Sequence, residues 1–135
     1  MGKKLNSHIV IPAKSDIFVH KIINKIPGML SFLEETSRKY DIPIINFGHF
    51  GDGNIHVNIM LDKNNAEMVR KGETAKYDIL KKTVELGGSL SGEHGIGLEK
   101  KEFMKLKYGD YYMNVLKNIK KAFDPQNIIN PGKIF

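Results

Sequence analysis

The sequence has 135 residues, 41% of them hydrophobic, which is enough for one domain with a single core and too few for two domains of ordinary size. It contains no cysteine, so disulfides, thiolate zinc sites, iron–sulfur clusters and cysteine nucleophiles are excluded, and a metal would be bound by His, Asp, Glu or Asn. It also lacks a run of about 18 apolar residues and an apolar signal after Met1, which predicts a soluble, cytoplasmic protein with no transmembrane segment.

The formal net charge of +6 does not by itself indicate nucleic acid, because the lysines are scattered along expected helices instead of forming one basic block. We therefore expect no nucleic-acid partner. A solvated helix surface explains most of the lysines, and attraction of small anionic substrates or of an acidic partner is the other interpretation.

The first half of the chain predicts extended segments followed by a helix. Residues 7–12 are β-branched and end in a proline, which indicates a strand or an extended arm, and residues 16–20 are again rich in strand formers. Pro27 suits the first position of a helix, and an apolar stripe continues from there until residues 41–43 end the pattern.

The second half predicts a hairpin and more helices. Residues 43–49 and 55–61 flank a Gly-Asp-Gly-Asn cluster, which is typical of a β-hairpin. Asn64 or Asn65 can cap the next helix, which we expect to close at Gly87-Gly88. Two further helices are expected at 98–106 and 110–123, before an irregular tail. The order strand, helix, strand, strand, helix predicts an α+β fold with an antiparallel sheet and helices on one face.

The hairpin predicts a chemical face. With a loop at 51–54, Phe50 pairs with Ile55 and His49 lies opposite His56, with Cβ atoms about 5 Å apart, so that both imidazoles could bind one metal ion. Asn58, two residues after His56, projects from the same side. The opposite, core-facing side would carry Gly48, Phe50, Ile55, Val57, Ile59 and Leu61.

A second cluster lies in the glycine-rich segment 87–97, where Glu93 and His94 are adjacent. Glu93 could complete a set of two histidines and one carboxylate, which is typical of catalytic metals, and His94 would then be the leading general base. Taken separately, each signal has an ordinary explanation. The histidines could simply be hydrogen-bonded residues, the Gly-Asp-Gly-Asn segment a turn, and the glycine-rich loop a phosphate cradle that lacks the P-loop lysine and hydroxyl.

Together the segments HFGDGNIH at 49–56, preceded by Gly48, and SGEHGIG at 91–97 resemble the two signatures of the C-terminal domain of FAD-linked oxidases. This family includes the glycolate oxidase flavin subunit, D-lactate dehydrogenases and D-2-hydroxyglutarate dehydrogenase. The resemblance extends through residues 16–27 and through the ending at 123–135, whereas residues 1–14 form a poorly matched arm.

The resemblance implies that His49, His56 and Glu93 bind a divalent metal, most often zinc, with manganese or iron as other possibilities. Asn58 and His94 match substrate-binding positions. The implied reaction oxidises a 2-hydroxy acid to a 2-oxo acid: the metal binds the carboxylate and hydroxyl oxygens, His94 accepts the hydroxyl proton as the catalytic base, and a hydride passes from the 2-carbon to FAD.

The resemblance also implies that the flavin-binding domain and part of the substrate domain are missing. We therefore expect residues 1–135 to be a single-domain fragment, half of a ferredoxin-like cap with a C-terminal helical tail, inactive alone and dependent on a flavin-binding domain or subunit. Its uncovered surface predicts a homo-oligomer. The alternative is a stand-alone metal- or anion-binding module without redox activity.

Overall fold

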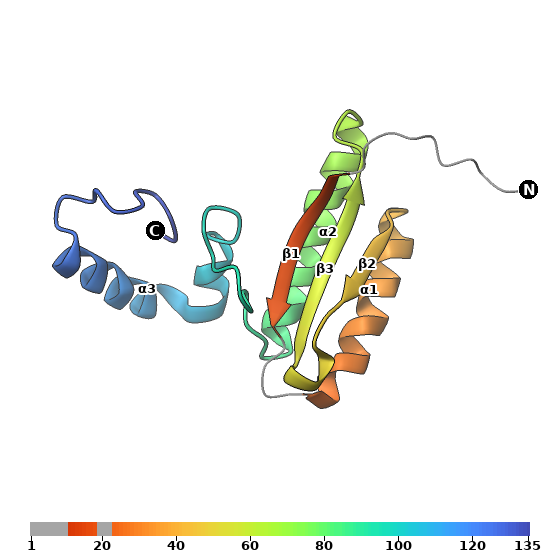
Figure 1. Cartoon of the computed structure of the whole chain (residues 1–135), viewed down its shortest axis with the longest axis horizontal. Helices are drawn as coiled ribbons and strands as arrows, with labels where there is room; N and C mark the ends of the chain where they lie inside the picture. The colour runs from red at the N-terminus through yellow and green to blue at the C-terminus, as the bar shows by residue number, and fades with distance from the viewer. Residues whose placement is uncertain (1–10, 19–22) are drawn as a thin grey trace, which may run out of the picture.

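The structure, a computed structural model, describes residues 11–18 and 23–135. Its centre is a three-stranded antiparallel sheet in which β3 (Asn54–Leu61) lies between β1 (Ile11–Phe18) and β2 (Ile44–Phe47). One face of the sheet is covered by helices and the other is not (Figure 1). The predicted α+β class is therefore confirmed.

Three longer helices and two 3₁₀ turns complete the described part of the chain. The covering helices are α1 (Ile26–Tyr40) and α2 (Ala66–Glu85), and α3 (Phe103–Phe123) extends to one side of the sheet (Figure 1). The short 3₁₀ turns are η1 (Ile23–Lys25) before α1 and η2 (Phe50–Asp52) between β2 and β3. Among the described helices, none is long and apolar enough to cross a membrane.

The core forms where β3 meets the two helices. Ile55, Val57 and Ile59 alternate along the strand and are fully buried, because every second side chain of a strand points to the same face. Each such side chain contributes roughly 1.5–3 kcal/mol of hydrophobic stabilisation. The helices add buried residues of their own to the same cluster, including Met29, Leu33, Ala75, Ile79 and Leu80.

The two covering helices begin and end as the sequence predicts. Pro27 lies in the first turn of α1, which ends where Asp41 adopts a left-handed conformation (φ 54°). The side chain of Asn65 caps α2 by accepting a hydrogen bond from the Met68 N–H at 3.0 Å. Gly87 (φ 81°) then reverses the backbone after α2.

The first strand differs from the expectation of two separate extended segments. Residues 7–10 and 19–20 lie outside the described residues. Among the described residues, one continuous strand, β1, includes the end of the first predicted segment and the start of the second. Pro12 does not interrupt it. Because β1 is an edge strand, a residue without an N–H can be accommodated there.

The break predicted between the helices at 98–106 and 110–123 is confirmed within the span of α3, but the first of these helices begins later than predicted. Residues before Phe103 form turns instead of a helix, and the break between the two predicted helices lies at Gly109 (φ 70°, ψ 171°) within α3. The irregular tail is confirmed: Asp124 accepts hydrogen bonds from the N–H groups of Ile128 and Ile129, both at 2.9 Å. With Lys120 also bonded to this carboxylate, the pKa of Asp124 is lowered.

The hairpin register is two residues away from the one predicted. Phe47, not His49, lies opposite His56, and Phe50 begins η2 instead of pairing with Ile55 on the core face. The connection is longer than predicted because the carbonyl of His49 accepts hydrogen bonds from the N–H groups of Asp52 and Asn54, at 2.9 and 3.2 Å. A slip of two residues keeps every side chain of β3 on its face, so the predicted chemical face survives.

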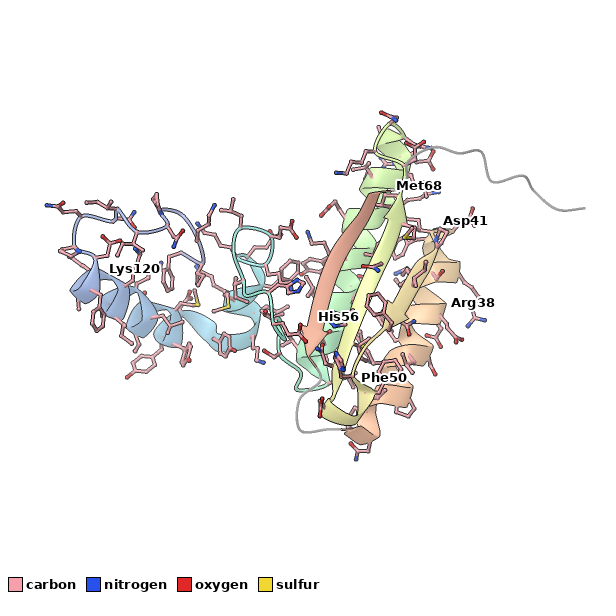
Figure 2. All side chains as sticks on the ribbon, in the orientation of Figure 1. Arg38, Asp41, Phe50, His56, Met68 and Lys120 are labelled. Atoms are coloured by element: carbon pink, nitrogen blue, oxygen red, sulfur yellow. The ribbon has the colours of Figure 1, made fainter. Side chains whose placement is uncertain are left out.

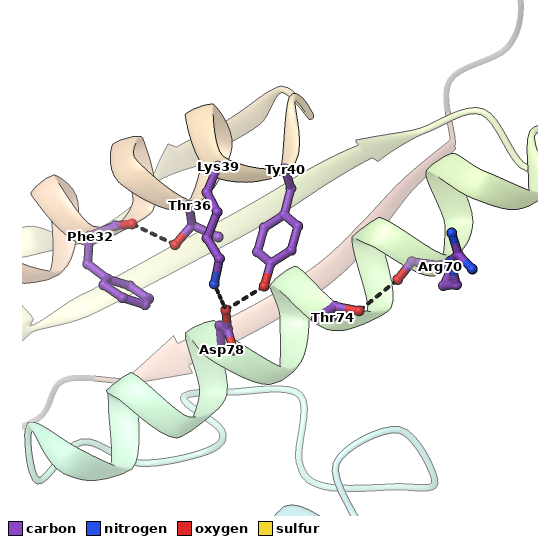
Figure 3. A network of polar contacts seen from close by, with 7 residues as sticks. All are labelled: Phe32, Thr36, Lys39, Tyr40, Arg70, Thr74 and Asp78. Carbon is purple, nitrogen blue, oxygen red and sulfur yellow. Dashed lines mark hydrogen bonds and ion pairs between the residues drawn. The ribbon is translucent and has the colours of Figure 1, made fainter.

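A polar network joins α1 to α2 across their exposed edge (Figure 3). Asp78 of α2 accepts hydrogen bonds from the Tyr40 hydroxyl at 2.7 Å and from Lys39 Nζ at 2.9 Å. These two hydrogen bonds lower the pKa of Asp78, and the bond from Tyr40 has the larger effect. A carboxyl whose pKa is lowered by folding stabilises the fold above its unfolded pKa, and this contribution is lost as the pH falls through the folded pKa.

We therefore predict that Asp78→Ala lowers the free energy of unfolding by about 1 kcal/mol at neutral pH. The difference from wild type should vanish in acid, once Asp78 is protonated. Urea unfolding between pH 7 and pH 2 measures both effects. Glu73→Ala is the matched control on α2, because Glu73 is 61% exposed and pairs only with Lys76 at 3.5 Å among the described residues. A loss for Asp78→Ala that is independent of pH would contradict the prediction.

Candidate metal centre

His56 projects from the face of the sheet opposite α1 and α2. It lies on β3 between the buried residues Ile55 and Val57, so its side chain points away from the core, and it is 14% exposed. The ring of its cross-strand partner Phe47 stacks on the imidazole with centroids 5.1 Å apart and planes 28° apart. In Figure 2 His56 lies on the sheet just above the turn that carries Phe50. This stacking holds the imidazole plane in one orientation.

His49 reaches the same place from the turn. Gly48 precedes it with φ 155°, and a Cβ at Gly48 would collide with the carbonyl oxygen of Asn54. A residue without a side chain therefore lets the end of β2 run against the start of β3. The His49 ring then lies edge-on to that of His56, with centroids 6.3 Å apart and planes 74° apart.

Glu93 comes from the loop that follows α2. Leu90, which is 1% exposed, anchors this loop in the core. Lys107 of α3 donates a hydrogen bond from Nζ to the carbonyl of Gly88 at 2.5 Å, and burial lowers the pKa of this lysine. At the other end of the loop segment, Glu93 Oε1 lies 4.0 Å from His56 Nε2 and accepts a hydrogen bond from Asn54 Nδ2 at 2.6 Å.

The three predicted ligands converge. One nitrogen of each of His49 and His56 and one carboxylate oxygen of Glu93 all lie within 4.8 Å of one another. Ligand atoms about 2.0–2.2 Å from a zinc ion can be separated by up to roughly 4 Å, so small side-chain rotations would bring all three into range. Two imidazoles and one carboxylate are also a donor set that suits zinc, manganese and iron. The residues therefore fit a divalent metal.

The two predicted substrate residues lie on the same side of the sheet. The ring of His94, next to Glu93 and exposed, has its centroid 6.4 Å from that of His56. Asn58 is half-buried two residues along β3 from His56, and its Cα partners are Ile45 on β2 and Lys14 on β1. His94 therefore lies close to His56, and Asn58 follows His56 on the same face of the strand.

Two members of this site were not identified from the sequence. Asn54 was interpreted as a turn residue, although it is 2% exposed and holds Glu93. Asn54, His56 and Asn58 are spaced by two, and this spacing in a strand is a signal that could have placed Asn54 on the chemical face. Phe47 was predicted in the strand, but its stacking on His56 depends on the hairpin register.

The comparisons with known proteins identify the family of the chain. The family "FAD linked oxidases, C-terminal domain" matches residues 10–134, and the chain belongs to this family. The resemblance expected from the two glycine-rich segments is therefore confirmed.

The similar curated proteins are named as a glycolate oxidase subunit, a D-2-hydroxyglutarate dehydrogenase and a D-lactate dehydrogenase. The chain is 40% identical over 112 residues to the glycolate oxidase subunit GlcD of Bacillus subtilis, covering 83% of this chain and 24% of that protein. It is 35% identical over 130 residues to the D-2-hydroxyglutarate dehydrogenase of Stutzerimonas stutzeri (92% and 27%) and 35% identical over 112 residues to the D-lactate dehydrogenase of Anaerostipes hadrus (82% and 24%). The chain spans about a quarter of the length of these relatives.

We predict that Gly48→Ala lowers the free energy of unfolding by about 2 kcal/mol, because the new Cβ meets the Asn54 backbone and the φ angle is strained. Gly51→Ala is the control in the same turn, since a Cβ there has nothing within 4 Å, and it should change stability by less than about 0.5 kcal/mol. Thermal unfolding of the two variants provides the comparison. Equal stabilities would show that the close approach at Gly48 is not required.

Proposed function

We propose that this chain is the substrate- and metal-binding portion of an FAD-dependent 2-hydroxy-acid dehydrogenase, which oxidises a 2-hydroxy acid to a 2-oxo acid. The observation that carries the proposal is the convergence of His49, His56 and Glu93, with His94 beside them. Family membership and the names of the relatives support the same reaction class.

Under this proposal His49, His56 and Glu93 hold a divalent cation, with zinc favoured and manganese or iron as alternatives. When bound, the cation supplies Lewis acidity, which lowers the pKa of a substrate hydroxyl. The protein residues do the remaining work at the substrate. Asn58 can donate or accept a hydrogen bond, which suits a carboxylate or a hydroxyl, and it shares the face of His56.

His94 is the proposed catalytic base. A neutral imidazole can accept the proton that leaves the substrate hydroxyl, and the His94 ring lies close enough to His56 to reach a substrate bound at the cluster. FAD supplies the acceptor for the hydride that leaves the 2-carbon. We propose that the flavin is bound mainly by a flavin-binding domain or subunit outside this chain, and that residues 1–135 form one part of the substrate domain.

The apolar residues around the cluster suit a covered surface. Ile45, Phe47 and Phe50 are 51%, 53% and 38% exposed beside the site. Exposed apolar groups of this size favour contact with other protein. They support the flavin-binding partner and equally the self-association predicted above, which stays a prediction.

Metal and substrate binding test the proposal together. We expect the purified chain to bind one Zn²⁺ or Mn²⁺ per molecule, and His56→Ala to weaken this binding by at least about 100-fold, because a direct ligand is lost. His94→Ala is the matched control, since it changes a neighbouring imidazole that is not a proposed ligand. Isothermal titration calorimetry provides the affinities.

With Mn²⁺ bound, the chain should broaden the proton resonances of D-lactate more than those of propionate, which lacks the 2-hydroxyl. Equal broadening of the two acids would favour the alternative function, a metal-binding module without hydroxy-acid recognition. Absence of metal binding in the wild-type chain would overturn the proposed centre.

We also expect that the chain alone does not oxidise 2-hydroxy acids. His49, His56, Glu93 and His94 can polarise a hydroxyl and remove its proton, but none of these side chains can accept a hydride. Free FAD would lack the positioning that makes hydride transfer fast. The assay is dye-coupled oxidation of glycolate, D-lactate and D-2-hydroxyglutarate with added FAD and zinc or manganese. Turnover that disappears in His94→Ala would show the chain to be a complete catalyst.

A further inference from the structure

Asn54 is more deeply buried than the other polar residues around the metal cluster. It is 2% exposed, at the first position of β3, and its Nδ2 donates a hydrogen bond to Glu93 Oε1 at 2.6 Å. The two residues are 39 positions apart in the sequence, so this bond ties the glycine-rich loop to the sheet.

The hydrogen bond to Glu93 satisfies only one of the two polar atoms of the Asn54 amide. Among the described residues nothing donates a hydrogen bond to the other end of the amide, Asn54 Oδ1, although that atom is buried. A buried acceptor without a donor opposes folding, so an apolar side chain of the same shape would suit the fold at least as well. The burial of an amide here is therefore explained better by what it does to Glu93 than by stability.

Glu93 needs such a partner. Its side chain is 52% exposed, and a solvated glutamate samples many rotamers. A short hydrogen bond to a carboxylate is among the stronger ones available to a neutral donor. It holds Oε1 4.0 Å from His56 Nε2 and leaves the carboxylate with further lone pairs for a cation.

We propose that Asn54 is a positioning residue that orients the Glu93 carboxylate toward the cluster of His49 and His56 and so raises its affinity for a divalent cation. The inference rests on the proposed metal centre and adds to it a residue that binds the ligand, not the metal. Outer partners of metal ligands typically contribute 10- to 100-fold in metal affinity.

The test is a double-mutant cycle with Asn54→Leu and Glu93→Ala, in which Zn²⁺ affinity is measured by competition with a chromophoric chelator. We expect Asn54→Leu to weaken Zn²⁺ binding about 10- to 100-fold. In the Glu93→Ala background it should cause no further loss, because Asn54 acts through Glu93. Thermal unfolding of the metal-free chain should show Asn54→Leu to be at least as stable as wild type.

Each contrary result is distinct. Equal Zn²⁺ affinities of wild type and Asn54→Leu, or an equal loss in the wild-type and Glu93→Ala backgrounds, would overturn the positioning role and leave the proposed metal centre intact. A wild-type chain that binds no Zn²⁺ would overturn both. If Asn54→Leu fails to fold, Asn54→Ala, which also has no donor for Glu93, takes its place in the cycle. One more readout needs no metal. In the metal-free chain, Glu93→Ala should shift the side-chain amide resonances of Asn54 relative to those of the wild type.

Discussion

The alternation of β3 is the constraint on which both the core and the site depend. Because successive side chains of a strand point to opposite faces, the same eight residues place Ile55, Val57 and Ile59 against the helices and His56 and Asn58 on the face that the helices do not cover. The strand is central in the sheet, with neighbours on both edges. Its position is thus determined by two ladders of backbone hydrogen bonds and by a packed face. The backbone of His56 is therefore held firmly in place.

The rest of the cluster is brought to β3 by tight backbone connections, not by secondary structure of its own. Gly48 allows the chain to pass against Asn54, and the carbonyl of His49 closes the turn by accepting two N–H groups. The loop of Glu93 is held at Gly88 by Lys107 and in the core by Leu90. A site on loops is precise only when the loops are anchored near the functional residue, and here the anchors lie within a few residues of each ligand.

The sequence predicted what local chemistry determines. Pro27 and Asn65 mark the starts of α1 and α2, and the period of two in β3 separates its core face from its polar face. The length of the hairpin connection was not predictable in this way, because a Gly-Asp-Gly-Asn segment suits turns of several lengths and the 3₁₀ turn depends on the His49 carbonyl. Even so, the error was an even number of residues and left His56 on its predicted face.

Proximity of Glu93 to the histidines was a different kind of inference. No periodicity relates residues 93 and 56, so the expectation came from the residue types that bind metals and from the resemblance to a family, and the contact of Asn54 with Glu93 was not foreseen. Long-range polar contacts of this kind depend on how α2 and its following loop return to the sheet. A local sequence pattern cannot specify such contacts. The packing of Leu90 in the core, which holds the loop against the sheet, contributes to them.

The exposure of the cluster bears on how the proposed chemistry is divided. Charge-stabilising groups act strongly only where water is excluded, yet the side chain of Glu93 is 52% exposed and His94 is also exposed. The exposed apolar side chains of Ile45, Phe47 and Phe50 form a surface that a covering protein would bury, and burying it would also remove water from the cluster. Under the proposed function, the same contact would therefore bring the flavin to the substrate and lower the dielectric around His94. In that proposal, the chain alone can bind metal and substrate in water, and fast hydride transfer requires the positioning that a flavin-binding partner would supply.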